Sequence, residues 1–157
     1  MLLQAYGIAL ELPRGWDGRI YRRPGASPTL HAANFGLPPE DADFGSGATG
    51  RMPNGGIFVA LKEYEAGPRL RPGVGLYESR SIPLPLQTRY FHPRMLQVGR
   101  SGEAGFQHFF TAPGERPFCL YAVIRRLGAG LEAPAHAQAQ VGQLSSVLSS
   151  LTIEAHK

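Results

Sequence analysis

The segments GEAGFQHFFT (102–111) and PFCLYAVIR (117–125) carry the strongest structural signal in this chain of 157 residues. Both are rich in aromatic and other apolar residues, and the intervening APGER (112–116) supplies the proline and glycine of a turn. Two such segments joined by a short turn predict a β-hairpin. Since both arms are apolar, we expect the hairpin to be central in an antiparallel sheet.

Four other segments predict further strands. IFVALKEY (57–64) is apolar on both faces, as expected of a strand that is covered on both sides. YGIALEL (6–12) alternates at period two and predicts one strand. After the turn residues of PRGW, the segments RIYRR (19–23) and TLHAANF (29–35) predict two more.

Long stretches rich in glycine and proline separate these segments. Residues 36–56 and 66–88 show little periodicity, so we expect irregular loops there, and long loops are usually functional or mobile. The GAG at 128–130 is predicted to end the sheet.

The segment after Pro134 has a different period. Its apolar residues recur at steps of four and three, and they are Ala137, Val141, Leu144, Leu148 and Leu151. This spacing predicts one helix with an apolar face, followed by a short extended LTI at 151–153. Strands followed by a helix indicate a single α+β domain over residues 1–157, mostly antiparallel sheet with a C-terminal α-helix packed on one face.

The opposite face of this helix carries no charge. Its residues are Gln138, Gln140, Gln143, Ser145, Ser146 and Ser149. Two interpretations stay open: an ordinary polar surface, or a contact with another chain, including a second copy in a homodimer. Under the second interpretation the interface residues are Gln138, Gln143 and Ser146.

The stretch DFGSGATGRMPNGGIFVALK (43–62) contains DFG, GSGATG and VALK, each of which is similar to part of a nucleotide-binding motif. A dinucleotide fingerprint needs a strand before the glycines and a helix after them, because the helix N-terminus holds the phosphate. Here PPEDAD precedes the glycines and RMPNGG follows them. A kinase would place DFG after the lysine strand. We therefore expect a glycine-rich turn and no cofactor.

A second interpretation of this loop stays open. Glycine-rich backbone can form a nest of N–H groups that binds anions. The loop 41–51 would then be an anion or small-ligand site, with Asp41, Asp43, Ser46 and Arg51 as its candidate residues.

No pattern of catalytic or metal-binding residues is present in the sequence. Cys119 is the only cysteine, which excludes an intrachain disulfide and thiolate-rich zinc sites. His31 and His108 lie in predicted strands and would form a facial metal triad if they met near Asp41 or Asp43. Histidines that serve the core or a sheet edge are commoner, so we expect no metal, no catalytic residues and no enzyme.

The formal net charge is +4, and nearly all the basic residues are arginines. They occur singly or in pairs without an interleaved aromatic stripe, so we do not expect nucleic-acid binding. No window approaches the ~20 apolar residues of a membrane span. The N-terminal residues lack the basic region of a signal peptide. We expect a cytoplasmic protein without a membrane partner.

Two short motifs frame this layout of antiparallel strands, late hairpin and terminal helix: LPRGW (12–16) ends the opening strand, and SLTI (150–153) closes the chain. The layout resembles the Mog1/PsbP-like fold, which includes small bacterial domains of the DcrB and type VI effector-chaperone kinds. The resemblance implies an antiparallel sheet with a helix packed on it and a binding role, with no catalytic residues to carry over. Members usually have a helix after the third strand, where this chain has the glycine-rich stretch 36–56.

These observations favour a non-enzymatic protein-interaction domain, such as an adaptor, chaperone or assembly component, whose partner is another protein. Two alternatives stay open. One is a small-ligand or anion-binding module that uses loop 41–51, and the other is an enzyme whose residues converge only in the folded chain.

Overall fold

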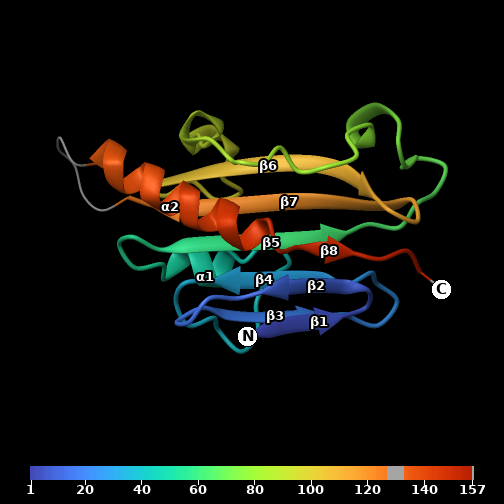
Figure 1. Ribbon diagram of the computed structural model, residues 1–157, viewed down its shortest axis with the longest axis horizontal. Helices are drawn as coiled ribbons and strands as arrows, with labels where there is room; N and C mark the ends of the chain where they lie inside the picture. The colour runs from blue at the N-terminus through green and yellow to red at the C-terminus, as the bar shows by residue number, and fades with distance from the viewer. Residues whose placement is uncertain (127–132, 157) are drawn as a thin grey trace.

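The structure of the protein is a computed structural model that describes residues 1–126 and 133–156 (Figure 1). It contains two antiparallel sheets, of which the larger has the strand order β3-β4-β5-β7-β6 and the smaller the order β1-β2-β8. The larger sheet consists of β3 (Asp17–Tyr21), β4 (Thr29–Ala33), β5 (Ile57–Glu63), β6 (Glu103–Ala112) and β7 (Arg116–Arg125). The smaller consists of β1 (Leu2–Ala5), β2 (Ile8–Glu11) and β8 (Thr152–Ile153).

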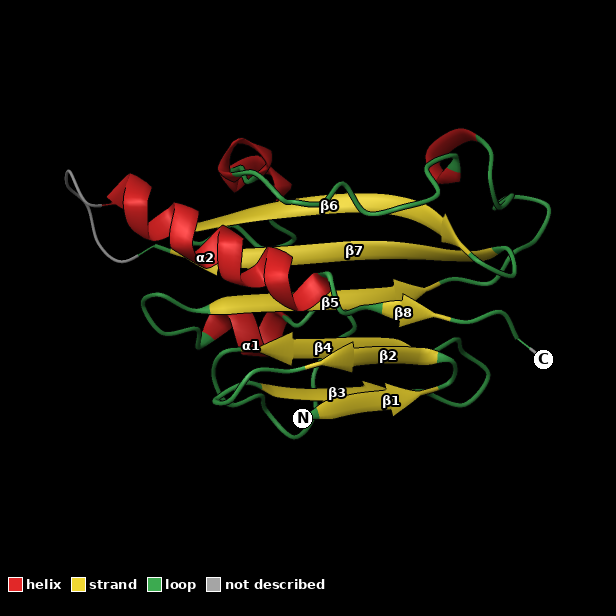
Figure 2. Ribbon diagram, in the orientation of Figure 1, coloured by secondary structure: helices red, strands yellow, loops and turns green. Residues whose placement is uncertain are grey.

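The helices lie around these sheets (Figure 2). They are α1 (Ser46–Gly50), α2 (Ala133–Leu148) and the 3-10 turns η1 (Gly75–Tyr77), η2 (Thr88–Tyr90) and η3 (Pro93–Met95). The predicted α+β class, mostly antiparallel sheet with a C-terminal helix, is confirmed. The sequence did not predict that the strands divide between two sheets.

The hairpin predicted from residues 102–125 is confirmed, but the expectation that both arms are central was wrong for β6, which is an edge strand of the large sheet. β6 and β7 pair without interruption from Glu103 opposite Arg125 to Ala112 opposite Arg116. β7 also pairs with β5 on its other side. The GAG segment at 128–130, predicted to end the sheet, lies outside the described residues.

The large sheet has two covered faces. We call the front face the one that carries Leu30, Leu61 and Leu120, which are register neighbours on β4, β5 and β7. The small sheet and α2 lie over this face in Figure 1 and enclose the main core with it. The exclusion of these apolar side chains from water is the largest stabilising contribution to the fold.

The back face is covered by α1 and the chain on either side of it. A second core cluster lies here, built on Phe58 and Tyr121 from the sheet and on Ala48 and Met52 from the covering segment. The two clusters explain why β5 is apolar on both faces. The stretch 36–56, predicted to be irregular throughout, thus contains one short helix that packs on the sheet.

The prediction of one strand over residues 6–12 was wrong at its start. Tyr6 and Gly7 both have positive φ (54° and 78°) and form a tight turn between β1 and β2. The turn was missed because it lacks the usual Asn-Gly or Asp-Gly, and β1 is only half-buried and shows no clear apolar alternation.

α2 and its apolar face are confirmed, but the polar face is narrower than predicted. Gln140 and Ser145 are buried. The Gln140 side-chain amide donates hydrogen bonds to the carbonyls of Gly56 and Arg125, and Ser145 Oγ accepts one from the Leu86 amide. The helix buries a wider stripe than its apolar residues alone because these two polar side chains find backbone partners.

Gln138, Gln143 and Ser146 remain on the exposed side of α2, as predicted. Gly142 lies among them, and a Cβ added there would meet no atom within 4 Å. A glycine inside a helix costs about 1 kcal/mol relative to alanine. Gly142→Ala is therefore expected to raise the free energy of unfolding by about 0.5–1 kcal/mol. Urea denaturation followed by circular dichroism measures this change, and a loss of stability would contradict it.

Candidate functional site

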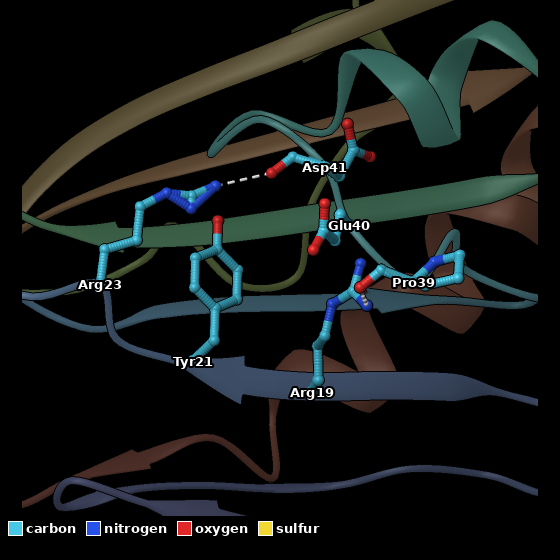
Figure 3. Close-up of a pocket in the computed structure, with 6 residues that line it drawn as sticks. All are labelled: Arg19, Tyr21, Arg23, Pro39, Glu40 and Asp41. Carbon is cyan, nitrogen blue, oxygen red and sulfur yellow. Dashed lines mark hydrogen bonds between the residues drawn. The ribbon is translucent and has the colours of Figure 1, made fainter.

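A cleft of about 570 Å³ lies on the back face, at the β3 side of the large sheet. Figure 3 shows its walls: Arg19 and Tyr21 project from β3, Arg23 follows the strand, and the chain at 39–41 faces them. Strand geometry explains this arrangement, because residues 19 and 21 share one face of β3. The alternation within RIYRR was the signal that could have identified these residues, which the sequence analysis did not select.

The two arginines of the cleft are held in place by main-chain carbonyls. Arg19 Nη1 donates a hydrogen bond of 2.8 Å to the carbonyl of Pro39, and Arg23 Nη2 donates one of 2.6 Å to the carbonyl of Asp41. The Arg23 guanidinium also lies 4.9 Å from the centre of the Tyr21 ring. A guanidinium has five N–H donors, so most of them remain free for a carboxylate or phosphate.

An ionic network around Asp43 lies next to the cleft and includes its lining residues Tyr21 and Arg23. Its carboxylate accepts hydrogen bonds from the Tyr21 hydroxyl at 2.8 Å and from Lys62 Nζ, and Arg23 Nη2 lies 3.4 Å away. Partial burial opposes ionisation, but the bonds from Lys62 and Tyr21 outweigh it and keep the pKa of Asp43 below its usual range. Burial and then the Asp43 carboxylate raise the pKa of Tyr21, which therefore remains a hydrogen-bond donor.

Asp41 occupies the N–H groups that the glycine-rich loop offers. Its Oδ1 accepts hydrogen bonds of 2.8 Å from the amides of Ala42 and Gly47, and its Oδ2 accepts one of 2.8 Å from Ala48. The loop therefore does form a small nest, but the protein's own carboxylate fills it. An external anion would have to displace Asp41 to reach these amides.

The four residues proposed for the loop site do not converge. Asp41 caps the loop amides, whereas Asp43 points to Tyr21 and Lys62. Ser46 begins α1, and its carbonyl lies 3.5 Å from Arg100 Nη2. Arg51 is exposed at the end of α1. Of the four, the structure places only Asp41 in the wall of the arginine cleft.

The alternative in which His31 and His108 meet at a metal is contradicted by the strand register. His31 is opposite Ala60, which is opposite Tyr121, and Tyr121 is opposite Gln107. His108 is the next residue after Gln107, so it points to the other face of the sheet. In residues 1–126 and 133–156 there is no group of three His, Cys, Asp or Glu side chains placed to hold a metal ion.

His31 instead holds the loop 41–51 in place through a hydrogen bond to its backbone. It is fully buried, and its Nε2 lies 2.7 Å from the carbonyl of Asp43, to which it donates as a neutral imidazole. Its ring packs edge-on against Tyr21 and Phe58. Burial lowers the pKa of His31 below its ordinary value of 6.5, although the bond to Asp43 opposes this shift.

The lowered pKa of His31 predicts that acid destabilises the protein. As the pH falls below 6.5, the unfolded chain protonates this histidine while the folded chain keeps it neutral. The unfolded state then binds more protons, so stability falls by up to about 1.4 kcal/mol per pH unit until the folded pKa is reached. Urea unfolding from pH 7 to about pH 5 measures this, with His31→Gln as the comparison. An equally steep pH dependence in His31→Gln would contradict the assignment.

Comparisons with family models, curated proteins and solved structures find no match to this chain. The resemblance to the Mog1/PsbP-like fold therefore stays a prediction. Among the described residues, no helix has both the length and the apolar character needed to cross a membrane.

Proposed function

We propose that this chain is a cytoplasmic, non-enzymatic protein-interaction domain that binds a segment of its partner at the arginine cleft. The observation that carries the proposal is the pre-positioning of Arg19 and Arg23 by the carbonyls of Pro39 and Asp41. Side chains that are already held in the bound geometry lose less conformational entropy on binding. The free, buried Cys119 is compatible with a reducing compartment.

The surroundings of the cleft favour a macromolecular partner. β1 lies next to β3, and Arg22 lies over the Tyr6 ring at 5.9 Å. Met1, Leu2 and Tyr6, which lie in and next to β1 in the small sheet, expose 65%, 58% and 46% of their surface. A partner that reaches around the β3 edge would cover these apolar side chains together with the arginines, whereas a small anion would leave them uncovered.

The exposed face of α2 provides a second, separate surface. α2, which carries the exposed Gln138, Gln143 and Ser146, lies over the front face of the large sheet (Figure 1), whereas the cleft lies on the back. Binding at the cleft therefore leaves this helix face free for another chain. Whether it forms a homodimer is tested by analytical ultracentrifugation at micromolar concentration, where a monomer would contradict a stable dimer.

A second candidate function is the binding of a small anion. The two guanidinium groups favour it, because arginine forms bidentate hydrogen bonds with carboxylate and phosphate. Since Asp41 already occupies the loop amides, such an anion would bind to the arginine side chains.

Selection from a displayed library of random peptides tests the proposal. We expect peptides that bind the wild-type chain and are lost when Arg19→Gln and Arg23→Gln are combined. Arg69→Gln is the matched control, because Arg69 is exposed on the distant 66–88 loop. A library that yields no peptide dependent on these two arginines would contradict the proposal. Thermal shifts with phosphate or citrate, lost in the same double variant, would instead support the second candidate.

A further inference from the structure

β3 is an edge strand of the large sheet. The amide of Asn34 donates a hydrogen bond to the carbonyl of Ile57, and the amide of Glu63 donates one to the carbonyl of Pro28. The N–H and C=O groups of the even-numbered residues of β4 therefore point toward β5. The N–H and C=O groups of the odd-numbered residues of β4 point the other way, toward β3, where they pair with the odd-numbered residues of that strand. Gly18 and Ile20 then direct their N–H and C=O groups outward. Across the described parts of the chain, no backbone hydrogen bond reaches them from that side.

The side chains beside this edge alternate regularly. Arg19, Tyr21 and Arg23 follow at period two toward the back face, where they line the cleft. A strand added at the edge would place every second side chain next to these three. Its acidic side chains at positions i and i+4 would meet the two arginines, and an apolar side chain at i+2 would meet Tyr21.

We propose that an extended acidic segment of a partner protein adds to the large sheet at the open edge of β3, with carboxylates against Arg19 and Arg23. This inference rests on the proposed protein-binding function and specifies its mode. In strand addition, main-chain hydrogen bonds supply affinity and alternate side chains supply specificity. β3 ends at Tyr21, so the segment would pair with the end of the strand and with the two residues that follow it.

Charge distinguishes an acidic partner from a second copy of this chain. A symmetric antiparallel pair of β3 strands centred on Tyr21 would bring Arg19 of one copy against Arg23 of the other. Like charges directly opposite one another are destabilising, and charged edge residues are a common protection against self-pairing. The same side chains attract a strand that carries carboxylates.

Glu40 is expected to weaken the binding of an acidic segment. It is exposed in the wall of the cleft, where Figure 3 shows it near Arg19. Its carboxylate competes with an acidic ligand for the same arginine. Glu40→Gln is therefore expected to strengthen binding of an acidic peptide by about threefold, a typical size for one exposed charge.

The test uses a synthetic peptide, acetyl-TEVYVET-amide, in which both glutamates and the tyrosine face the cleft. Fluorescence anisotropy of a labelled peptide on the full chain measures its Kd. The glutamine peptide TQVYVQT, and Arg19→Gln with Arg23→Gln on the protein, should each weaken binding by about tenfold. Arg69→Gln should leave the Kd unchanged.

Backbone methylation separates strand addition from simple charge attraction. The two valines would lie opposite Ile20 and Arg22, so their N-methylation removes N–H groups that the edge requires and should weaken binding more than about tenfold. N-methylation of the two glutamates changes groups that point away from the sheet and should have little effect.

Equal affinity of the valine-methylated and unmodified peptides would overturn strand addition while leaving the protein-binding function standing. Failure of TEVYVET to bind at millimolar concentration would overturn the acidic pattern, whereas the library selection decides the broader function separately. Binding of TEVYVET that persists when both arginines are replaced would contradict the arginine cleft as the binding site and the acidic-segment inference alike. A dimer that dissociates in Arg19→Glu would assign the edge to a second copy and overturn the inference.

Discussion

Replacement of Arg116 by methionine is expected to lower the free energy of unfolding by about 3–5 kcal/mol, the usual cost of breaking a buried ion pair from one side. Arg116 is 1% exposed and Glu63 is 6% exposed. The guanidinium donates to both oxygens of the Glu63 carboxylate, at 3.1 and 2.7 Å. Methionine fills a similar volume but leaves the carboxylate buried without its cation.

The same guanidinium joins the two sheets. It donates hydrogen bonds to the carbonyl of Tyr6 in the β1–β2 turn, at 3.0 Å, and to the carbonyl of Glu154 after β8, at 2.7 Å. Arg116 itself belongs to the large sheet, and both carbonyls directly follow strands of the small one. Its loss should therefore loosen the small sheet in addition to destabilising Glu63.

Urea denaturation of Arg116→Met measures the effect. Arg80→Met is the matched control, because the Arg80–Glu115 pair has the same 2.7 Å distance but is 57% and 61% exposed. An exposed pair contributes about 0–1 kcal/mol. If Arg116→Met does not fold, the double variant Glu63→Gln with Arg116→Met is used instead. It replaces the unpaired buried carboxylate by a neutral amide and should recover part of the stability. A loss below about 1 kcal/mol in Arg116→Met would contradict the assigned role.

Gly45→Ala is expected to destabilise the protein by about 2–4 kcal/mol, through backbone strain and overpacking together. Gly45 has φ of 70°, in the left-handed region. A Cβ at this position would lie 2.1 Å from Cζ of Phe58, whose ring is fully buried beneath the loop. Either the ring or the loop has to move, and both belong to the back-face core.

Thermal unfolding and peptide binding together test this second prediction. Gly36→Ala, in the same covering segment, is the control, because a Cβ there meets no atom within 4 Å. We expect Gly36→Ala to unfold like the wild type, and Gly45→Ala to unfold at lower temperature and to bind TEVYVET more weakly. Wild-type stability in Gly45→Ala would show that the loop does not pack on Phe58 as described.

The glycines of the DFGSGATG stretch thus have a structural role that its similarity to nucleotide-binding motifs conceals. Gly45 lets the loop approach Phe58, and Gly47 donates its amide to Asp41. The flanking segments PPEDAD and RMPNGG are unlike those of a phosphate loop. What those segments could not predict is that an internal carboxylate takes the position of the anion.

Local pattern was sufficient for the elements whose apolar residues repeat at a regular spacing along the chain. The 102–125 hairpin, the two-sided apolar strand at 57–63 and the apolar face of α2 were all predictable, because period two and period 3.6 are properties of the backbone itself. The alternation in RIYRR also indicates that the side chains of Arg19, Tyr21 and Arg23 share one side of the strand, as they do in the wall of the cleft.

Contacts between distant parts of the chain decided the rest. The burial of Gln140 depends on carbonyls at residues 56 and 125, and the clamp of Arg116 joins residues 6, 63 and 154. The cleft exists only because the chain at 39–41 returns along β3. A polar side chain becomes buried, paired or free according to which backbone groups tertiary packing brings to it, and no local period records that choice.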